Sequence, residues 1–426
     1  MLNNQKANLS PLISNKNYNF FGSTTKNYNF SSDLSPKNER LGSITKSCAN
    51  IDFKGLGEIQ IKRAERYALQ DEAVRLLPSE RVRFCLKHRI DNAQGVEVMY
   101  NPIREQAHYA NVQRCGSVWT CPVCSAQISE GRRQELKQGI AHWRQQGGAV
   151  YLLTLTNPHY YGDNLIQLLE GQKRALHRLW TLRKPREMFE MLGKVGHVTA
   201  TEVTHGSNGW HPHYHILLFF KKPINAKSLR GFLASVWQNC CAKSGLKVPS
   251  INHGVDVREG DYADKYVSKW GLEDEVTKGH SKKGREGSNT PWDLLRLSES
   301  GCTDSGRLFQ VFAESFKGKR QLSWSKGLKA LLLVDDVTDE ELATETERDS
   351  VQVKELALEL WHLIKRYKER AGYLKAVEHD VKYGSQRANN LIESLALRYV
   401  KDYKDEMMAN ADLHEVRAKA LEVSHV

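Results

Sequence analysis

The chain has 426 residues, of which 40% are hydrophobic and 26% are charged. At ~100–200 residues per domain, this length predicts two or three domains, and the composition excludes a wholly disordered or fibrous protein. No apolar run approaches the ~20 residues that cross a bilayer. The N-terminal sequence MLNNQKANLS also lacks the features of a secretory signal. We therefore expect an intracellular, cytoplasmic protein with no membrane partner.

The charge is unevenly distributed along the chain. Lys and Arg number 62 against 50 Asp and Glu, which gives a net charge of +12. Residues 335–426 hold 14 basic and 20 acidic residues, so the first 334 residues carry a net charge of +18. Such an excess favours a polyanionic partner such as nucleic acid, although a generic basic surface is the alternative.

The N-terminal segment, residues 1–55, is rich in Asn and Ser and has little apolar periodicity. This composition predicts a disordered tail. The tail contains the pentapeptide KNYNF twice. The repeat is either drift within a low-complexity segment or an element whose aromatic rings stack on nucleobases.

A helical and zinc-knuckle segment is expected over residues 56–147. Its apolar spacing predicts one helix at 56–84 that ends near Pro78, and a second helix at 125–146. Three cysteines lie close together between these two helices: Cys115, Cys121 and Cys124. A CPxC knuckle is typical of a structural, tetrahedral Zn²⁺ site, which needs a fourth ligand. Cys85 is the first choice for that ligand, with His108 or His88 as alternatives.

Residues 148–335 alternate between strand and helix patterns. The expected elements are a strand at 149–156, a helix at 164–192, a strand pair at 195–204 and 211–220, a helix at 225–244, a strand at 254–258 and a helix at 261–270. The segment 277–290 is rich in Gly and Lys and predicts a loop, and TPWDLL after it predicts a helix start. Residues 336–426 predict a separate helical C-terminal region.

The most informative motif is WHPHYHILLFF at 210–220. Alternate side chains of a strand point to the same face, so His211, His213 and His215 share one face and apolar residues the other. Imidazoles two residues apart on a strand suit a shared divalent ion. Histidines on a plain solvent face are the alternative.

The preceding strand offers a third ligand. A turn centred between Ser207 and Asn208 places Glu202 opposite His213 on the same face. Two imidazoles and one carboxylate leave open positions, which suits Mg²⁺ or Mn²⁺ acting on a phosphate. A register slip of one residue would make Glu202 an ordinary strand residue.

A second motif, YADKYVSK at 262–269, has helical spacing. Four side chains share one face of this helix: Tyr262, Lys265, Tyr266 and Lys269. Phenols flanked by ammonium groups suit a nucleophile that attacks a phosphodiester, because a tyrosine of pKa ~10 needs nearby positive charge to react. An amphipathic helix packed by its rings is the alternative.

At these motifs the sequence resembles the rolling-circle replication initiators of small bacterial plasmids, members of the HUH endonuclease superfamily. YLLTLT at 151–156 resembles their first motif, and HPHYH resembles their metal motif, with His213 and His215 as the HUH pair. YADKYVSK resembles their tyrosine motif. The cysteine segment, TPWDLL and RQLSWSKGLK also resemble stretches of this group, so the resemblance spans about residues 80–335.

The resemblance implies a metal-dependent nicking and strand-transfer enzyme in the bacterial cytoplasm. Its implied fold is α+β, a central antiparallel sheet flanked by helices over residues 148–335. The implied substrate is single-stranded or extruded origin DNA. Tyrosine attack forms a 5′-phosphotyrosine and frees a 3′-OH primer, and a host helicase and polymerase are the expected partners.

One departure from the family pattern leaves the biological role open. Many single-tyrosine plasmid initiators have an acidic residue where this chain has Tyr262, and the two-tyrosine form is similar to that of phage initiators and some transposases. We interpret Tyr266 as the first nucleophile because VSK follows it, with Tyr262 as a second nucleophile or a packing residue. A non-catalytic, zinc-containing DNA-binding protein is the competing class.

Overall fold

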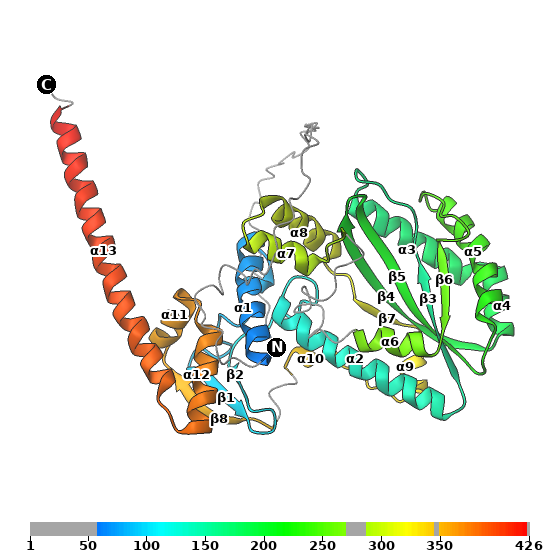
Figure 1. Ribbon diagram of the computed structural model, residues 1–426, viewed down its shortest axis with the longest axis horizontal. Coiled ribbons are helices and arrows are strands. Elements are labelled where there is room, and N and C mark those ends of the chain that lie inside the picture. The colour runs from blue at the N-terminus through cyan, green and yellow to red at the C-terminus, as the bar shows by residue number, and fades with distance from the viewer. Residues whose placement is uncertain (1–57, 270–286, 345–348, 424–426) are drawn as a thin grey trace, which may run out of the picture. The chain divides into compact units, whose positions relative to one another are not determined.

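Residues 58–269, 287–344 and 349–423 are described here from a computed structural model of the chain (Figure 1). The expected N-terminal tail and most of the expected loop at 277–290 lie outside these residues. Among the described helices, none combines the length and apolar composition required to cross a membrane.

The larger sheet has five antiparallel strands in the order β6-β3-β5-β4-β7. Its strands are β3 (Ala149–Leu155), β4 (Lys194–Gly206), β5 (Gly209–Phe220), β6 (Val255–Glu259) and β7 (Leu322–Trp324). The β4 and β5 strands form the expected hairpin, and the register pairs Glu202 with His213 as predicted. Gly209 has φ of 80° at the hairpin turn, a conformation that favours glycine.

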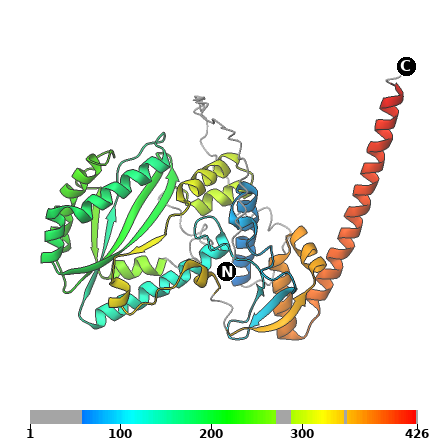
Figure 2. The same ribbon diagram turned by 180° about the vertical axis from the view of Figure 1, so that it is seen from behind.

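Helices cover both faces of this sheet (Figures 1 and 2). On one face, alternate β5 residues such as Ile216 and Leu218 pack with α3 (Leu165–Thr181) and α5 (Ala226–Ala242). On the other face, Leu217 and Phe219 belong to a core formed with α2 (Pro122–Gln145), α6 (Asp261–Lys269) and α9 (Leu328–Leu331). Strict alternation along β5 thus divides its side chains between two cores.

The expected helix at 164–192 is two helices, α3 and α4 (Arg183–Met191). The break falls at Leu182, whose ψ of 139° is extended. Pro185 explains the break: it lacks an N–H and its ring would clash with the carbonyl of the residue four positions earlier in a continuous helix. In α4 it occupies the first turn, where no donor is needed.

A smaller antiparallel sheet has the order β2-β1-β8. It contains β1 (Val96–Asn101), β2 (Gln106–Ala110) and β8 (Val351–Leu356), and the sequence analysis predicted none of these strands. The C-terminal region is therefore not wholly helical, because β8 lies within it and pairs with β1. The helices that follow are α11 (Leu358–Arg366), α12 (Arg370–Tyr383) and α13 (Arg387–Val423).

Buried ion pairs join the C-terminal region to α1 (Glu58–Leu76). Arg63 contacts Glu378 of α12 at 2.7 Å, and Arg370 contacts Asp71 at 2.8 Å. Buried charges of this kind are stable only when paired and hydrogen-bonded. The pairs therefore hold α12 against α1 in one specific arrangement.

The remaining helices are η2 (Arg81–Arg83), α7 (Pro291–Glu299), α8 (Thr303–Phe316) and α10 (Asp339–Thr344). The helix start predicted at TPWDLL is α7, with Pro291 at its first position. Thr290 and Asp293 form a reciprocal capping box there, which satisfies two backbone donors of the first turn. Arg296 of α7 then pairs with Glu65 at 2.6 Å, so α7 is fixed to α1.

Candidate metal centres and tyrosine site

Glu202, His213 and His215 come together on one face of the β4–β5 hairpin. Their potential ligand atoms all lie within 4.8 Å of one another. The Nε2 atoms of His213 and His215 each lie 3.5 Å from Oε2 of Glu202. One carboxylate and two imidazoles that converge in this way are a donor set that fits a divalent cation with positions left open.

The other ring nitrogen of each histidine already has a partner. Nδ1 of His213 lies 3.3 Å from the carbonyl oxygen of His211, and Nδ1 of His215 lies 3.0 Å from Oγ1 of Thr154. Such contacts fix the orientation and tautomer of a metal-binding imidazole. Both rings therefore direct Nε2 toward Glu202.

Glu202 is charged at neutral pH. Burial alone would raise its pKa, but His215, then His213 and the hydrogen bond from Tyr266 outweigh that effect and lower the pKa to about 2. The carboxylate is thus an acceptor for the groups around it. Beside it lies a cleft of about 90 Å³, which Thr201 and Gln321 also line.

Tyr266 is the tyrosine that reaches this group. Its hydroxyl donates a hydrogen bond of 2.8 Å to Oε1 of Glu202. Its ring centroid lies 4.8 Å from that of His215, and the ring packs against the core under α6. The helix motif and the histidine strand, about 50 residues apart in the sequence, thus meet at one point.

The other residues of the helix motif lie elsewhere. Tyr262 is 46% exposed and lines a separate cleft near Glu259. The guanidinium of Arg258 lies 4.8 Å from its ring centroid, and Nζ of Lys265 lies 5.2 Å away. The structure therefore does not bring Tyr262 or Lys265 to Glu202. The side chain of Lys269 lies outside the described part of the chain.

Four buried cysteines form the second candidate metal centre: Cys85, Cys115, Cys121 and Cys124. Sulfur–sulfur distances within the group are 3.4, 3.6 and 3.7 Å. A tetrahedral ion with bonds of ~2.3 Å separates its sulfur ligands by ~3.8 Å, so the group fits such an ion. The structure brings Cys85 to this group, while the alternatives His88 and His108 are not members.

A polar chain connects the cysteine group to the buried ion pairs. Nε2 of Gln70 donates to Sγ of Cys121 at 3.3 Å, and Arg370 donates to Oε1 of Gln70 at 2.7 Å. Hydrogen bonds of this type stabilise thiolate charge and orient the ligand. A residue of α12 thus supports a site formed by residues far earlier in the chain.

Local sequence patterns do not identify Thr154, Gln70 or Arg370 as site residues. Thr154 is one of two threonines in the apolar stretch YLLTLT, which is a local signal, but its partner follows only from the β3–β5 register. Gln70 and Arg370 come from distant helices, and no spacing rule connects them. These supporting residues depend on tertiary contacts.

The fold and the two sites define an α+β protein with a Glu-His-His group, an adjoining tyrosine and a four-cysteine group. Residues 106–374 match the family described as "Replication protein". Because that match covers more than half of the chain, the protein belongs to this replication protein family, as the motifs indicated.

Two relatives named "Protein rep" support the same assignment. The chain is similar to "Protein rep" of Streptomyces lividans, with 27% identity over 53% of this chain and 64% of the relative. It is also similar to "Protein rep" of Lentilactobacillus hilgardii, with 36% identity over 24% of this chain and 32% of the relative. A third relative is "Neomycin resistance protein" of Streptomyces cyanogenus, with 35% identity over 25% of this chain and 30% of the relative.

These similarities each cover less than two thirds of the relative's own length. No solved structure matches the chain.

Proposed function

We propose that this protein is a plasmid replication initiator of the HUH endonuclease type that nicks one strand of origin DNA through Tyr266. The observation that carries the proposal is the 2.8 Å hydrogen bond from Tyr266 to Glu202, beside His213 and His215. A nucleophile in contact with a candidate metal ligand is in reach of the phosphate that such a site would bind. The replication protein family supports the same process.

The chain's own residues account for the nucleophilic step. The Tyr266 oxygen attacks the scissile phosphorus and loses its proton as the oxygen–phosphorus bond forms. The bond from phosphorus to the 3′ oxygen breaks, and that oxygen takes up a proton to become a free 3′-OH. Tyr266 keeps the 5′-phosphate as a phosphotyrosine, and the 3′-OH is the primer for rolling-circle synthesis.

Glu202, His213 and His215 would hold the catalytic cation, for which we propose Mg²⁺ or Mn²⁺. When bound, such a cation supplies Lewis-acid stabilisation of the phosphate charge. Thr154 and the His211 carbonyl keep the two imidazoles aimed at this position. We assign to Lys269 the neutralisation of charge on the attacked phosphate, since it follows Tyr266 by three positions on α6.

The four-cysteine group has a different proposed role, which is to hold a structural Zn²⁺. All four thiols are buried, and they leave no open coordination position for a substrate. In this proposal the cysteine group stabilises the fold, and the Glu202 group takes part in the reaction. Single-stranded or extruded origin DNA is the proposed substrate, with a host helicase and polymerase as partners in the bacterial cytoplasm.

Covalent capture tests the proposal. The full chain is incubated with Mn²⁺ and single-stranded oligonucleotides that tile the DNA flanking its own gene, and SDS-stable complexes are resolved on a gel. We expect capture by the wild type, none by Tyr266→Phe, and capture by Tyr262→Phe. Salt-sensitive binding without capture by any protein would instead identify a non-catalytic DNA-binding protein.

We further propose that Tyr262 acts in the second strand transfer, which closes the displaced circle. Arg258 and Lys265 flank its ring and place positive charge where a phosphate would approach. Because Tyr262 lines a separate cleft, this step requires α6 or the DNA to move between the two attacks. Tyr262→Phe is therefore expected to retain capture and to lose closed single-stranded circles. Circles formed at the wild-type rate would exclude this role.

A further inference from the structure

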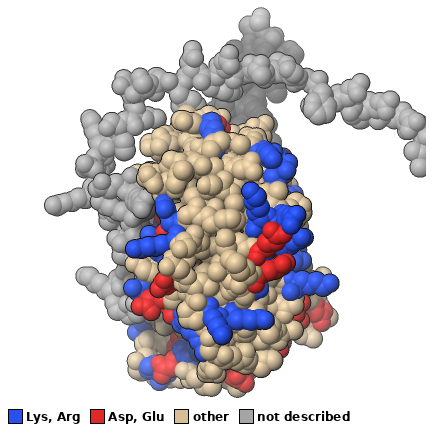
Figure 3. Space-filling view, turned by 90° about the vertical axis from the view of Figure 1, so that its right-hand side faces the viewer, with Lys and Arg blue, Asp and Glu red and all other residues tan. Residues whose placement is uncertain are grey.

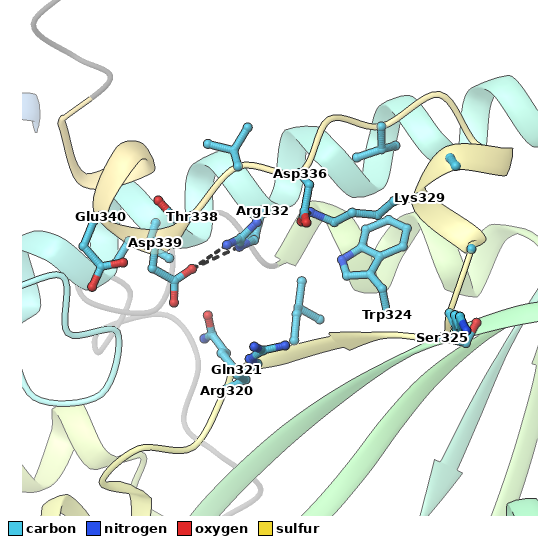
Figure 4. Close-up of a pocket in the computed structure, with 17 residues that line it drawn as sticks. Arg132, Arg320, Gln321, Trp324, Ser325, Lys329, Asp336, Thr338, Asp339 and Glu340 are labelled. Atoms are coloured by element: carbon cyan, nitrogen blue, oxygen red, sulfur yellow. Dashed lines mark hydrogen bonds and ion pairs between the residues drawn. The ribbon is translucent and has the colours of Figure 1, made fainter.

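Two open cavities of similar size have no member of the Glu202 group in their walls. One has a volume of about 750 Å³ and is bounded by α2, β7 and the segment that leads into α10 (Figure 4). The other has a volume of about 770 Å³ and lies between the segment after η2, α11 and α13. The charges that line them decide which one suits a polyanion.

In the first cavity, opposite charges of the same wall pair with each other. Arg132 contacts Asp339 at 2.6 Å, and Lys329 contacts Asp336 at 3.0 Å (Figure 4). The surface at the α4 and α5 end is also mixed, with Asp and Glu among its Lys and Arg side chains (Figure 3). The wall of the first cavity holds three acidic residues against four basic ones, which suits a polyanion poorly, and we assign neither surface a ligand.

We name the second cavity the α11 cleft. Eight residues line it: Lys87, His88, Glu359, His362, Leu363, Lys365, Arg366 and Tyr399. Among the residues that the structure describes, Glu359 is the one acidic member of its wall. Lys87 and Arg366 also pair with Asp71 and Glu406, which lie outside the wall.

Cations lie near two of the groups in the α11 cleft, Lys365 and His88. Burial lowers the pKa of Lys365, and Lys87, Arg370 and Arg89 lower it further. Burial likewise lowers the pKa of His88, with Lys365, Arg83 and Lys87 adding to the effect. The charges that act on these two groups are therefore cations, and an anion bound between them would relieve the repulsion.

Aromatic rings accompany these cations. Tyr399 is 42% exposed, and the guanidinium of Arg366 lies 5.3 Å from its ring centroid. His88 and His362 present two further rings, and Leu363 adds an apolar surface. Exposed rings within a cationic groove form the surface on which unstacked bases lie while their phosphates contact Lys and Arg.

We propose that the α11 cleft is a second DNA site, which binds unpaired nucleotides of the origin strand outside the nicking site. This inference rests on the proposed function for the choice of DNA as ligand. Its residues belong to the segment after η2, to α11 and to α13, and none belongs to the five-stranded sheet. The cleft would therefore hold the strand independently of the metal ligands and Tyr266.

Fluorescence anisotropy of the full chain with a labelled oligothymidylate of about 15 nucleotides tests this site, because that probe lacks origin sequence. Tyr399→Ala should weaken binding by roughly 5- to 150-fold, because a base can no longer stack on the ring. The double variant Lys365→Gln, Arg366→Gln should reduce the salt slope by about 0.7 for each phosphate that it no longer neutralises. Lys401→Gln, an exposed charge on α13 outside the cleft, should change neither quantity.

The outcomes separate this proposal from the nicking function. Unchanged affinity and salt slope in both cleft variants, or no binding by the wild type, would overturn the α11 site even where Tyr266 is captured. Loss of affinity in the cleft variants with no covalent capture by the wild type would support the α11 site and overturn the nicking function.

Discussion

Glu202 connects three functional side chains, since both imidazoles and the Tyr266 hydroxyl approach its carboxylate. Its negative charge is therefore central to the proposed cation site. Glu202→Gln keeps the shape but removes that charge, so we expect Mn²⁺ affinity to fall at least about tenfold with the fold intact. Calorimetric titration measures this, with Glu259→Gln of β6 as the control. Equal Mn²⁺ affinity in the wild type and the Glu202 variant would exclude Glu202 as a ligand.

His197 is a residue with a predictable effect on acid stability. Burial, with Lys194 beside it, lowers its pKa from 6.5 to about 3, and its ring stacks on Trp180. The unfolded chain therefore binds a proton that the folded chain does not between these values, so stability falls as pH drops from 6.5 toward 3. At pH 4 the free energy of unfolding is expected to be about 3 kcal/mol lower than at neutral pH because of this one histidine.

His197→Phe retains the ring and removes the titration. Urea unfolding at pH 7 and pH 4 should show a smaller loss of stability on acidification in this variant than in the wild type. His177→Phe, at an exposed position of α3, should behave as the wild type. If His197→Phe loses as much stability between pH 7 and pH 4 as the wild type, other groups cause the pH dependence.

Much of the candidate site followed from local patterns. The alternation of His213 and His215, and the turn that pairs Glu202 with His213, are properties of one hairpin, and the register confirms them. The separate position of Tyr262 could not be predicted, because four residues of helix advance ~6 Å along the axis and carry the ring beyond the point where Tyr266 meets the sheet. Where α6 crosses the sheet is a property of tertiary packing.

The cysteine group brings together segments that are separate in the sequence. Cys85 follows η2, Cys115 follows β2, and Cys121 caps the N-terminus of α2. A closed thiolate site contributes to folding free energy. Cys121→Ser should therefore abolish zinc content and lower the Tm by at least about 5 °C, as measured by metal analysis and calorimetry.

The exposed Cys302 supplies the matched control, because Cys302→Ser leaves the group unchanged. A Cys121→Ser protein that is folded, active and free of zinc would contradict the structural role.

Elements with local signals were predictable, and elements that depend on distant partners were not. The β5 strand and α7 have clear periodicity and caps, so their positions follow from the sequence. The β8 strand was missed because its alternate residues Val351 and Val353 are exposed and its partner β1 lies about 250 residues earlier. The apolar residues on either side of β8 have helical spacing, which predicts helix across the whole region.

For the whole molecule, the net charge of +12 predicts strongly salt-dependent binding of DNA. Each phosphate contact on a single strand should contribute about −0.7 to the slope of log K against log salt. We also expect single-stranded or extruded DNA to be nicked in preference to relaxed duplex, because Tyr266 needs an accessible phosphate. Equal nicking of relaxed linear duplex and single strands would contradict this expectation.

We propose that Tyr266 becomes joined to the 5′-phosphate of nicked DNA. Mass spectrometry of the captured complex, after digestion with nuclease and protease, identifies the residue that carries the nucleotide. We expect a nucleotide adduct on the peptide that contains YADKYVSK, with fragment ions that place it on Tyr266. An adduct on any other residue after the first nick, or none in a protein that nicks the strand, would contradict the claim.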